Sequence, residues 1–357
     1  MKVLIGIQHP KQVHLFRNSY FQLTGKQHQV KVLAIDKEIT RELLEKYHIP
    51  YILLGKNQPT LGKKALSLVG REYQTLKIAR EFRPDLIVGR AVPHLAHVSA
   101  LLRIPFIIFE DTELAAAIHK ITVPFASTII TPSSYLGNFG EKHIRYNGFD
   151  ELSYLHPRYF SPDPGVLKDL GLKEGDPFII LRFISWNAYH DSSLKGISDY
   201  TALIRELEPF GKVFVSSEGP LDPALEKYRL RIEPDKAHSL LYYASLYLGE
   251  GGTMAAEAAI LGTPAIHIEG DKSGGATGNT CGNFRELHDR YGMLYFFADQ
   301  DAAFSKATEL LKNRNVKQEW QKKREALLHD KIDVTAWITD FIERYPDSFY
   351  KNRGLHG

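Results

Sequence analysis

The stretch Tyr247–Ile268 reads YLGEGGTMAAEAAILGTPAIHI and decides the fold. A short apolar run, Ala244–Leu248, predicts a buried parallel strand that breaks into a glycine-rich turn. An alanine-rich helix is predicted over Met254–Leu261, and a further strand over Ala265–Ile268. The order of strand, glycine turn, helix and strand is typical of a parallel α/β sheet.

The glycine turn is suited to binding an anion. Gly251 and Gly252 let backbone N–H groups approach a ligand closely, and the unpaired donors and dipole at a helix start favour phosphate. Glu257, about one helical turn further on, can accept hydrogen bonds from two neighbouring hydroxyls, such as a ribose diol. The alternative is that these glycines only turn a tight corner in an α/β domain.

The segment GGTMAAEAAILGTPAI resembles the donor-binding segment of GT-B glycosyltransferases and of non-hydrolysing UDP-N-acetylglucosamine 2-epimerases. In those families a Gly-Gly turn holds the diphosphate, and a Glu before a Gly-x-Pro ending holds the ribose. The resemblance implies that Gly251, Gly252 and Thr253 face a diphosphate and that Glu257 faces a ribose.

Length and composition indicate an ordinary globular protein. A chain of 357 residues is long for one core and predicts two domains, while 43% hydrophobic and 24% charged residues exclude a disordered chain. The single cysteine, Cys281, excludes an internal disulfide and a Cys-rich zinc site. No apolar run is long enough to span a membrane and the N-terminus predicts a strand rather than a signal peptide, so a cytoplasmic protein is expected.

The charge of the chain is unevenly distributed. Residues 1–150 carry 20 Lys and Arg against 12 Asp and Glu, whereas the remainder carries 25 against 30. This asymmetry suggests that the first half meets an acidic acceptor or lipid surface, and no nucleic-acid partner is expected. A basic amphipathic segment, Gly55–Arg83, predicts peripheral contact with the inner face of an anionic membrane, unless it is a solvated helix face. The residues expected in that contact are Lys56, Lys63, Lys64 and Arg71.

The first domain begins with a strand at Met1–Ile7, a helix at Leu15–Thr24 and a strand at Val30–Ile35. The loop between the first strand and helix carries His9, Lys11 and His14. Ligands of doubly wound sheets lie beyond the carboxyl ends of the strands, so this loop is expected in the functional crevice. His14 is a candidate general base, and a capping or packing role is the alternative.

A predicted strand at Ile104–Phe109 ends in the acidic sequence EDTE. Glu110 and Asp111 are candidates for a general base or for recognition of sugar hydroxyls. The sequence from Ile104 to Tyr135 resembles the glycosyltransferase that adds N-acetylglucosamine to lipid-linked peptidoglycan precursor. The epimerases carry a His-Gly-Asp motif one strand earlier, where this chain has Gly89-Arg90-Ala91, and this difference favours a transferase.

The second domain is expected after a proline-rich linker at 155–164, with strands at Phe178–Phe183, Lys212–Ser216 and Leu230–Ile232. Arg182 is expected to offset charge on a departing diphosphate, and His190 to donate a hydrogen bond to it. The alternative is a buried Arg182 paired with Asp191. Further donor-binding candidates are Trp186, Asn187, Glu218, Asn283 and Glu286.

Together, RFISWNAYHD, YNGFDELSYLHP, SSEGPL and the glycine-turn segment resemble a prokaryotic GT-B-like family known as a domain of unknown function. The resemblance covers nearly the whole chain and implies two Rossmann-like, doubly wound parallel-sheet domains facing across a cleft. The expected divisions are an acceptor domain at 1–155, a donor domain at 165–340 and a tail at 341–357.

The expected function is a glycosyltransferase that uses a UDP-linked sugar for polysaccharide or glycoconjugate synthesis, with a saccharide or lipid-linked acceptor. No cofactor is expected, and no metal, because an Asp-x-Asp motif is absent from the sequence. Two alternatives remain: a UDP-N-acetylhexosamine 2-epimerase, and a nucleotide-sugar-binding protein without catalytic activity.

Overall fold

The computed structural model describes residues 1–56, 61–183, 197, 199–217, 219–271 and 273–353. The chain forms two compact units, one made of Met1–Tyr154 with Ile332–Gly357 and the other of Leu155–Lys331. The chain crosses between units close to the start of the expected linker. Residues 332–340, expected in the second domain, belong instead to the first unit, as do the residues expected to form a tail.

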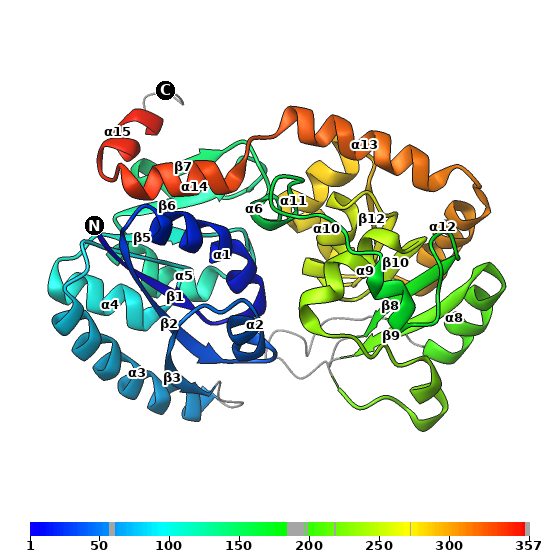
Figure 1. The fold of residues 1–357 in the computed structure, drawn as a ribbon, viewed down its shortest axis with the longest axis horizontal. Helices are drawn as coiled ribbons and strands as arrows, with labels where there is room; N and C mark the ends of the chain where they lie inside the picture. Colours follow the sequence, from blue (N-terminus) through cyan, green and yellow to red (C-terminus); the bar gives the residue numbers. More distant parts are fainter. Residues whose placement is uncertain (57–60, 184–196, 198, 218, 272, 354–357) are drawn as a thin grey trace. The chain divides into compact units, whose positions relative to one another are not determined.

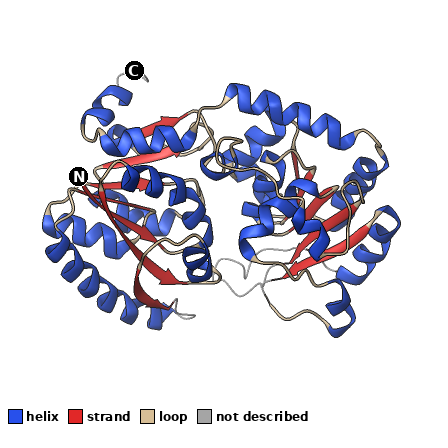
Figure 2. Cartoon of the chain, viewed as in Figure 1, coloured by secondary structure: helices blue, strands red, loops and turns tan. Residues whose placement is uncertain are grey.

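The first unit is built on a parallel sheet that, within the described residues, has seven strands in the order β3-β2-β1-β4-β5-β6-β7 (Figure 1). Helices lie on both sides of the sheet (Figure 2). The strands are β1 (Lys2–Ile7), β2 (Gln29–Asp36), β3 (Ile52–Lys56), β4 (Leu86–Gly89), β5 (Phe106–Phe109), β6 (Thr128–Pro132) and β7 (His143–Tyr146). The helices are α1 (Pro10–Gly25), α2 (Thr40–Lys46), α3 (Leu61–Phe82), α4 (Pro93–Leu102), α5 (Ala116–Thr122), α6 (Leu152–Leu155), α14 (Val334–Glu343) and α15 (Asp347–Arg353), with short 3₁₀ turns η1 (Val123–Phe125) and η2 (Gly140–Lys142).

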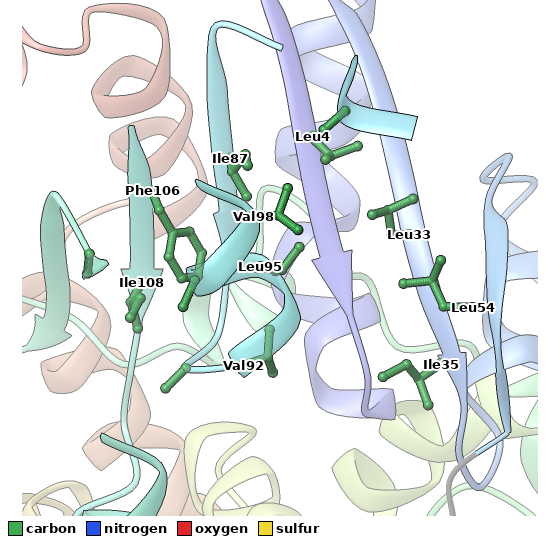
Figure 3. Close-up of a cluster of buried hydrophobic side chains, with 14 of the residues drawn as sticks. Leu4, Leu33, Ile35, Leu54, Ile87, Val92, Leu95, Val98, Phe106 and Ile108 are labelled. Atoms are coloured by element: carbon green, nitrogen blue, oxygen red, sulfur yellow. The ribbon is translucent and has the colours of Figure 1, made fainter. Parts of the chain in front are cut away.

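One face of this sheet is buried under α4. Leu4 of β1, Ile87 of β4 and Phe106 of β5 pack with Leu95 and Val98 of α4 in one hydrophobic cluster (Figure 3). Such burial of aliphatic and aromatic side chains is the main stabilising contribution to a fold of this kind.

Close packing of α4 depends on a glycine in β1. A Cβ placed on Gly6 would lie 2.3 Å from Leu95 Cδ1, so a larger residue would have to displace the Leu95 side chain. Gly6 therefore leaves the space on β1 that Leu95 of α4 fills.

The last part of the chain completes the first unit. Helix α14 packs against α1, and the Thr335 hydroxyl donates to the Ser153 carbonyl at 2.6 Å. The Ile332 N–H donates to the Asn147 carbonyl at 3.0 Å. Residues 347–353 of the expected tail form α15, whose Ser348 hydroxyl donates to the Phe341 carbonyl at 2.7 Å.

The second unit has a parallel sheet whose order, within the described residues, is β12-β11-β10-β8-β9 (Figure 1). Its strands are β8 (Phe178–Phe183), β9 (Lys212–Ser217), β10 (Leu246–Gly249), β11 (Ala265–Ile268) and β12 (Leu294–Phe297). Its α-helices are α7 (Gly165–Asp169), α8 (Tyr200–Leu207), α9 (Ala237–Tyr243), α10 (Gly252–Ile260), α11 (Gly282–Arg285), α12 (Gln300–Lys312) and α13 (Val316–Asp330). Shorter turns are η4 (Glu208–Phe210), η5 (Pro223–Tyr228), η6 (Pro234–Lys236), η7 (Thr277–Thr280) and the π-helical η8 (Glu286–Arg290).

Two expected elements differ from the structure. The strand predicted at Leu230–Ile232 is wrong, because these residues form no strand and only the preceding residue, Arg229, makes an isolated bridge, to Val215. Helix α1 begins at Pro10 rather than at Leu15, because Pro10 fits the first helical position and His9 Nδ1 accepts the Lys11 N–H at 3.2 Å. Lys11 and His14 therefore lie in a helix and not in a loop.

In the described part of the chain, no helix combines the length and the apolar character that crossing a membrane requires.

Candidate functional site

Helix α10 begins after a glycine that has no side chain to cap it. Gly251 is the capping residue, in extended conformation with φ −86° and ψ 105°. The first turn of the helix contains no acidic residue. Since the first N–H groups of a helix lack intrahelical partners and carry a partial positive charge, this end of α10 is suited to an anion.

Side chains of α13 complement the opposite end of the same helix. Gln321 Nε2 donates to the carbonyls of Leu261 at 3.2 Å and Gly262 at 3.1 Å. Arg324 Nε donates to the Ile260 carbonyl at 3.2 Å. A cation at the C-terminus stabilises the helix dipole, whose positive end lies at Gly252.

Arg182 stands at the carboxyl end of β8, directly beside the α10 turn. Its Nη1 donates to Ser216 Oγ at 2.8 Å. A Cβ on Gly249 would lie 2.6 Å from Arg182 Cβ, and a Cβ on Gly251 would lie 3.1 Å from Arg182 Cγ. The two glycines therefore leave room for the arginine, which adds a positive charge next to the N-terminus of α10.

Buried polar contacts fix the turn itself. The Tyr247 hydroxyl donates to the Gly251 carbonyl at 3.0 Å, and Glu250 Oε1 accepts the Ile197 N–H at 2.9 Å. His267 Nε2 lies 3.2 Å from the Glu250 carbonyl, so it must carry the proton and donate. Burial lowers the pKa of His267 to about 4, which keeps the ring neutral at pH 7.

Glu257 of α10 and His238 of α9 are in contact. Both side chains are buried, and Glu257 Oε1 lies 3.2 Å from Nε2 of His238 in α9. The Phe160 ring meets the His238 imidazole edge-on, with 6.3 Å between ring centroids. The structure gives His238 a carboxylate partner.

The remaining donor-binding candidates divide into two groups. Glu286 Oε1 lies 2.5 Å from Lys331 Nζ, and Asn283 Oδ1 accepts the Phe284 N–H at 2.9 Å, so both make local contacts within the second unit. Thr253 lies in the first turn of α10. The other candidates lie outside the residues that the structure describes: Trp186, Asn187, His190 and Glu218, with Asp191, the alternative partner of Arg182.

A second group of polar residues lies at the carboxyl ends of the strands in the first unit. These residues follow β1, β4, β5 and β7, and together they are named the charge cluster. It consists of Lys11, Arg90, Glu110, Asp111, Asp150 and Glu151.

Asp111 is the centre of the charge cluster. Lys11 Nζ contacts Asp111 Oδ2 and lies 2.7 Å from Glu151 Oε1. Arg90 Nη1 lies 2.9 Å from Asp111 Oδ1, and Arg90 Nη2 contacts Asp150 Oδ2. The two cations come from separate elements and converge on one carboxylate.

The two cations also change the acidity of the carboxyl groups. Burial alone would raise the pKa of Asp111, but the charges of Arg90 and Lys11 outweigh it and hold that pKa well below its ordinary value. For Asp150 and Glu151, burial has the larger effect and raises the pKa despite the same cations. An ionised carboxylate held by two cations is a weak base, so this environment makes Asp111 a poor proton acceptor.

Glu110 has a different environment from its neighbour. Its Oε1 accepts the N–H groups of Asp111 and Thr112, each at 3.0 Å. Its Oε2 lies 3.2 Å from Nε2 of His119 in α5. Sequence reasoning missed His119, because nothing in the local pattern separates it from other helical histidines.

The other sequence candidates in the first unit lie apart from this pair. The His14 ring packs against the rings of Tyr154 and Tyr47, with centroids 5.1 Å and 5.7 Å away. Arg71 Nη2 donates to the Lys56 carbonyl at 2.7 Å, which ties α3 to the end of β3. Lys63 and Lys64 lie in α3, and their side chains are outside the described part of the structure.

Among the residues that the structure describes, no group of three or more His, Cys, Asp or Glu side chains is arranged to hold a metal ion. Metal-independent chemistry remains a prediction from the sequence.

The solved structures of a UDP-GlcNAc 2-epimerase and of a rhamnosyltransferase are similar to this chain. The UDP-GlcNAc 2-epimerase from Neisseria meningitidis, solved bound to UDP-GlcNAc, is 13% identical, with a TM-score of 0.69 over 96% of this chain and 100% of that chain. The spinosyn rhamnosyltransferase SpnG is 12% identical, with a TM-score of 0.61 over 96% of this chain and 100% of that chain. At these identities the likeness shows the fold, which is two Rossmann-like units of the GT-B type.

The sequence is similar to that of an archaeal protein. The uncharacterized protein MJ0665 of Methanocaldococcus jannaschii is 27% identical over 278 residues, which are 74% of this chain and 81% of that protein. Residues 1–277 match the family described as "Protein of unknown function (DUF354)". This match includes both the charge cluster and the α10 stretch. The chain therefore belongs to the DUF354 family.

Proposed function

We propose that this protein is a glycosyltransferase that uses a nucleotide-linked sugar, with UDP as the nucleotide. The second unit binds the donor at the start of α10, and the first unit binds a saccharide or lipid-linked acceptor. The GT-B fold supports the proposal, because nucleotide-sugar enzymes with this fold are among its structural neighbours. The fold alone does not assign a reaction, so the argument rests on the residues.

One observation carries the donor assignment: an uncapped helix start, an arginine and a buried carboxylate occur together at the carboxyl end of one sheet. The N-terminus of α10 and Arg182 provide positive charge for a diphosphate. Glu257, placed by His238, offers a carboxylate to the ribose hydroxyls. In transfer, the same helix dipole and guanidinium stabilise the departing diphosphate without a metal ion.

The acceptor assignment rests on the first unit. Its sequence is basic overall, which suits an acceptor that carries phosphate. Glu110 lies at the end of β5, where ligands of doubly wound sheets bind. For a lipid-linked acceptor, the basic helix α3 rests on an anionic membrane, and the exposed Val69 and Tyr73 on the same helix contact the lipid.

The missing aspartate argues against the epimerase alternative. Where the epimerases are expected to carry His-Gly-Asp, this chain has Gly89-Arg90-Ala91, so Ala91 takes the place of the aspartate. An alanine side chain has no group that can remove a proton from a sugar carbon. The neighbouring Arg90 is buried in contact with Asp111 and Asp150. The transferase therefore fits this segment better than the epimerase does.

The test is the thermal unfolding of the full chain with UDP, ADP, GDP and their sugar conjugates. A ligand that binds the native state raises the melting temperature, by an amount equivalent to about 2.7 kcal/mol at about 100 times its dissociation constant. We expect stabilisation by UDP and UDP-sugars that is lost in Glu257→Ala. If none of these compounds raises the melting temperature, the transferase and the epimerase are both wrong.

The same experiment is followed by a screen for turnover. UDP release that depends on an added saccharide or prenyl-phosphate sugar supports the transferase. Isomerisation of the UDP-sugar without an acceptor supports the epimerase, and binding without turnover over the whole screen supports a binding protein.

A further inference from the structure

The glycine turn that precedes α10 is held from the sheet by two buried side chains. The Tyr247 hydroxyl, from β10, donates to the Gly251 carbonyl at 3.0 Å. His267 Nε2, from the neighbouring strand β11, donates to the Glu250 carbonyl at 3.2 Å. Tyr247 is fully buried and His267 is 2% exposed. Two successive carbonyls of the turn are therefore fixed by side chains that lie in the interior of the second unit.

The Tyr247 hydroxyl keeps its proton and acts as a hydrogen-bond donor. Burial raises the pKa of Tyr247 above the ordinary value for a phenol, so the group stays neutral. The Gly251 carbonyl also accepts the Ala255 N–H at 3.1 Å, which is the first hydrogen bond of α10. Because a carbonyl oxygen has two lone pairs, these two donors satisfy it.

The bonds to this one carbonyl set the direction of an N–H group. A trans peptide is planar, so the Gly251 carbonyl and the Gly252 N–H point in opposite directions. Gly252 is the first residue of α10, and its N–H has no partner within the helix. With the carbonyl held by Tyr247 and Ala255, the Gly252 N–H is directed out of the start of the helix.

The peptide between Gly251 and Gly252 would rotate easily without the hydroxyl. Rotation of this plane changes mainly ψ of Gly251 and φ of Gly252, and a glycine adopts positive φ about as readily as negative φ. A rotated plane turns the partly negative carbonyl oxygen toward the position of the ligand, where it repels a phosphate. The Tyr247 hydroxyl adds a second bond that opposes this rotation.

We propose that Tyr247 is a positioning residue of the donor site, which keeps the Gly252 N–H directed at the diphosphate. This inference rests on the proposed function. The hydroxyl is buried and does not contact the ligand, so it acts only through the Gly251–Gly252 peptide. Its effect is therefore specific to the phosphate part of a nucleotide and leaves the nucleoside part unchanged.

The test compares the affinities of the full chain and of Tyr247→Phe for UDP, uridine and inorganic pyrophosphate. Calorimetry measures the tighter ligands, and NMR titration observed on the ligand measures the weaker ones. Phenylalanine keeps the ring and removes only the hydroxyl. We expect the affinities for UDP and pyrophosphate to fall about 3- to 10-fold, as for one lost hydrogen bond, and that for uridine to stay within about twofold.

Tyr291→Phe is the matched control. Tyr291 is also buried in the second unit, and its hydroxyl lies 3.3 Å from Asp330 Oδ2 rather than from the α10 turn. All three affinities are expected to be unchanged in this variant. Thermal unfolding without ligand shows whether Tyr247→Phe is folded, and Tyr247→Met takes its place if it is not, with the same expected changes.

Two results would overturn the role of Tyr247 while the donor site stands. Equal losses of affinity for UDP and uridine would mean that the hydroxyl supports the second unit as a whole. An unchanged affinity for UDP would mean that the hydroxyl does not direct the Gly252 N–H. If the wild type binds UDP no more tightly than uridine, no diphosphate is held at the start of α10, and the proposed donor site is overturned together with this role.

Discussion

Glu257 and His238 form a buried pair in the second unit, with 3.2 Å between Oε1 and Nε2. If His238 holds the Glu257 carboxylate in place for a ribose, then removing the His238 side chain weakens nucleotide binding only because Glu257 is less well positioned. We expect His238→Ala to lower UDP affinity about 3- to 10-fold and Glu257→Ala about 10- to 100-fold, as for hydrogen bonds to charged groups. Isothermal titration calorimetry measures both.

The double variant then shows whether the two residues act as one. Glu257→Ala with His238→Ala is expected to bind UDP no more weakly than Glu257→Ala alone. His329→Ala is a matched control, since that side chain is 91% exposed on α13. Losses that add would mean that His238 contacts the nucleotide itself.

Two glycines of the α10 turn are expected to behave differently on substitution by alanine. A Cβ on Gly252 would lie 3.5 Å from Phe284 Cζ, an ordinary contact, so Gly252→Ala folds with unchanged stability. The methyl group stands where a phosphate approaches the backbone N–H groups, so UDP affinity falls by about tenfold or more. A Cβ on Gly249 would lie 2.6 Å from the Arg182 carbonyl oxygen, so Gly249→Ala loses about 1–3 kcal/mol of stability.

Urea unfolding and UDP titration of both variants check this contrast. Normal UDP binding by folded Gly252→Ala would show that no phosphate approaches the start of α10. The donor site would then have to lie elsewhere in the second unit.

Because two buried histidines have lowered pKa values, we expect the protein to lose stability in mild acid. Burial lowers the pKa of His94 to about 3 and that of His267 to about 4, against about 6.5 in the unfolded chain. Because the unfolded state then binds more protons, the stabilising contribution is complete above pH 6.5 and is lost as the pH falls toward 4. Urea unfolding at pH 7, 6 and 5 is expected to show a falling free energy of unfolding.

The variant His94→Asn tests whether His94 contributes to this dependence of the free energy of unfolding on pH. An asparagine can keep a contact to the Thr75 hydroxyl, which lies 3.1 Å from His94 Nδ1, but it does not titrate. The decrease between pH 7 and pH 5 is expected to be smaller in this variant than in the wild type. An unchanged slope would contradict the assignment.

Membrane contact through α3 predicts binding to anionic vesicles. Each basic residue near such a surface contributes about 1 kcal/mol. Sedimentation with phosphatidylglycerol vesicles is expected to carry the protein down at low salt, and Lys56→Glu with Lys63→Glu and Lys64→Glu to abolish this. A matched triple change of the exposed Lys312, Arg314 and Lys322 in the second unit is the control. An equal loss of vesicle binding in the control variant would indicate non-specific attraction between the charges of the protein and the vesicle.

Local sequence patterns were sufficient to predict the bounds of an element when those bounds depend only on its own residues and their immediate neighbours. Strand β11 has the predicted bounds, because it is a mostly apolar run that follows Pro264 and ends at the acidic Glu269. The start of α1 was missed because a histidine is not among the residues that usually cap a helix. The three-residue run at Leu230–Ile232 is too short to decide between strand and loop.

Contacts between distant residues could not be predicted in the same way. Lys11 and Asp111 are 100 positions apart, and only the order of β1, β4 and β5 in the sheet brings them together. The sequence placed each of them near a strand end, but not in one cluster. His119 was missed for the same reason, because its partnership with Glu110 depends on how α5 returns over the end of β5.

The first unit consists of two chain segments, which the ribosome synthesises at different times. This separation affects the order in which the two units fold. Helix α14, which packs against α1, is translated after the whole of the second unit. The second unit, by contrast, is a continuous stretch from Leu155 to Lys331. On the ribosome it can therefore finish folding first, while the amino-terminal sheet waits for the last helices to emerge.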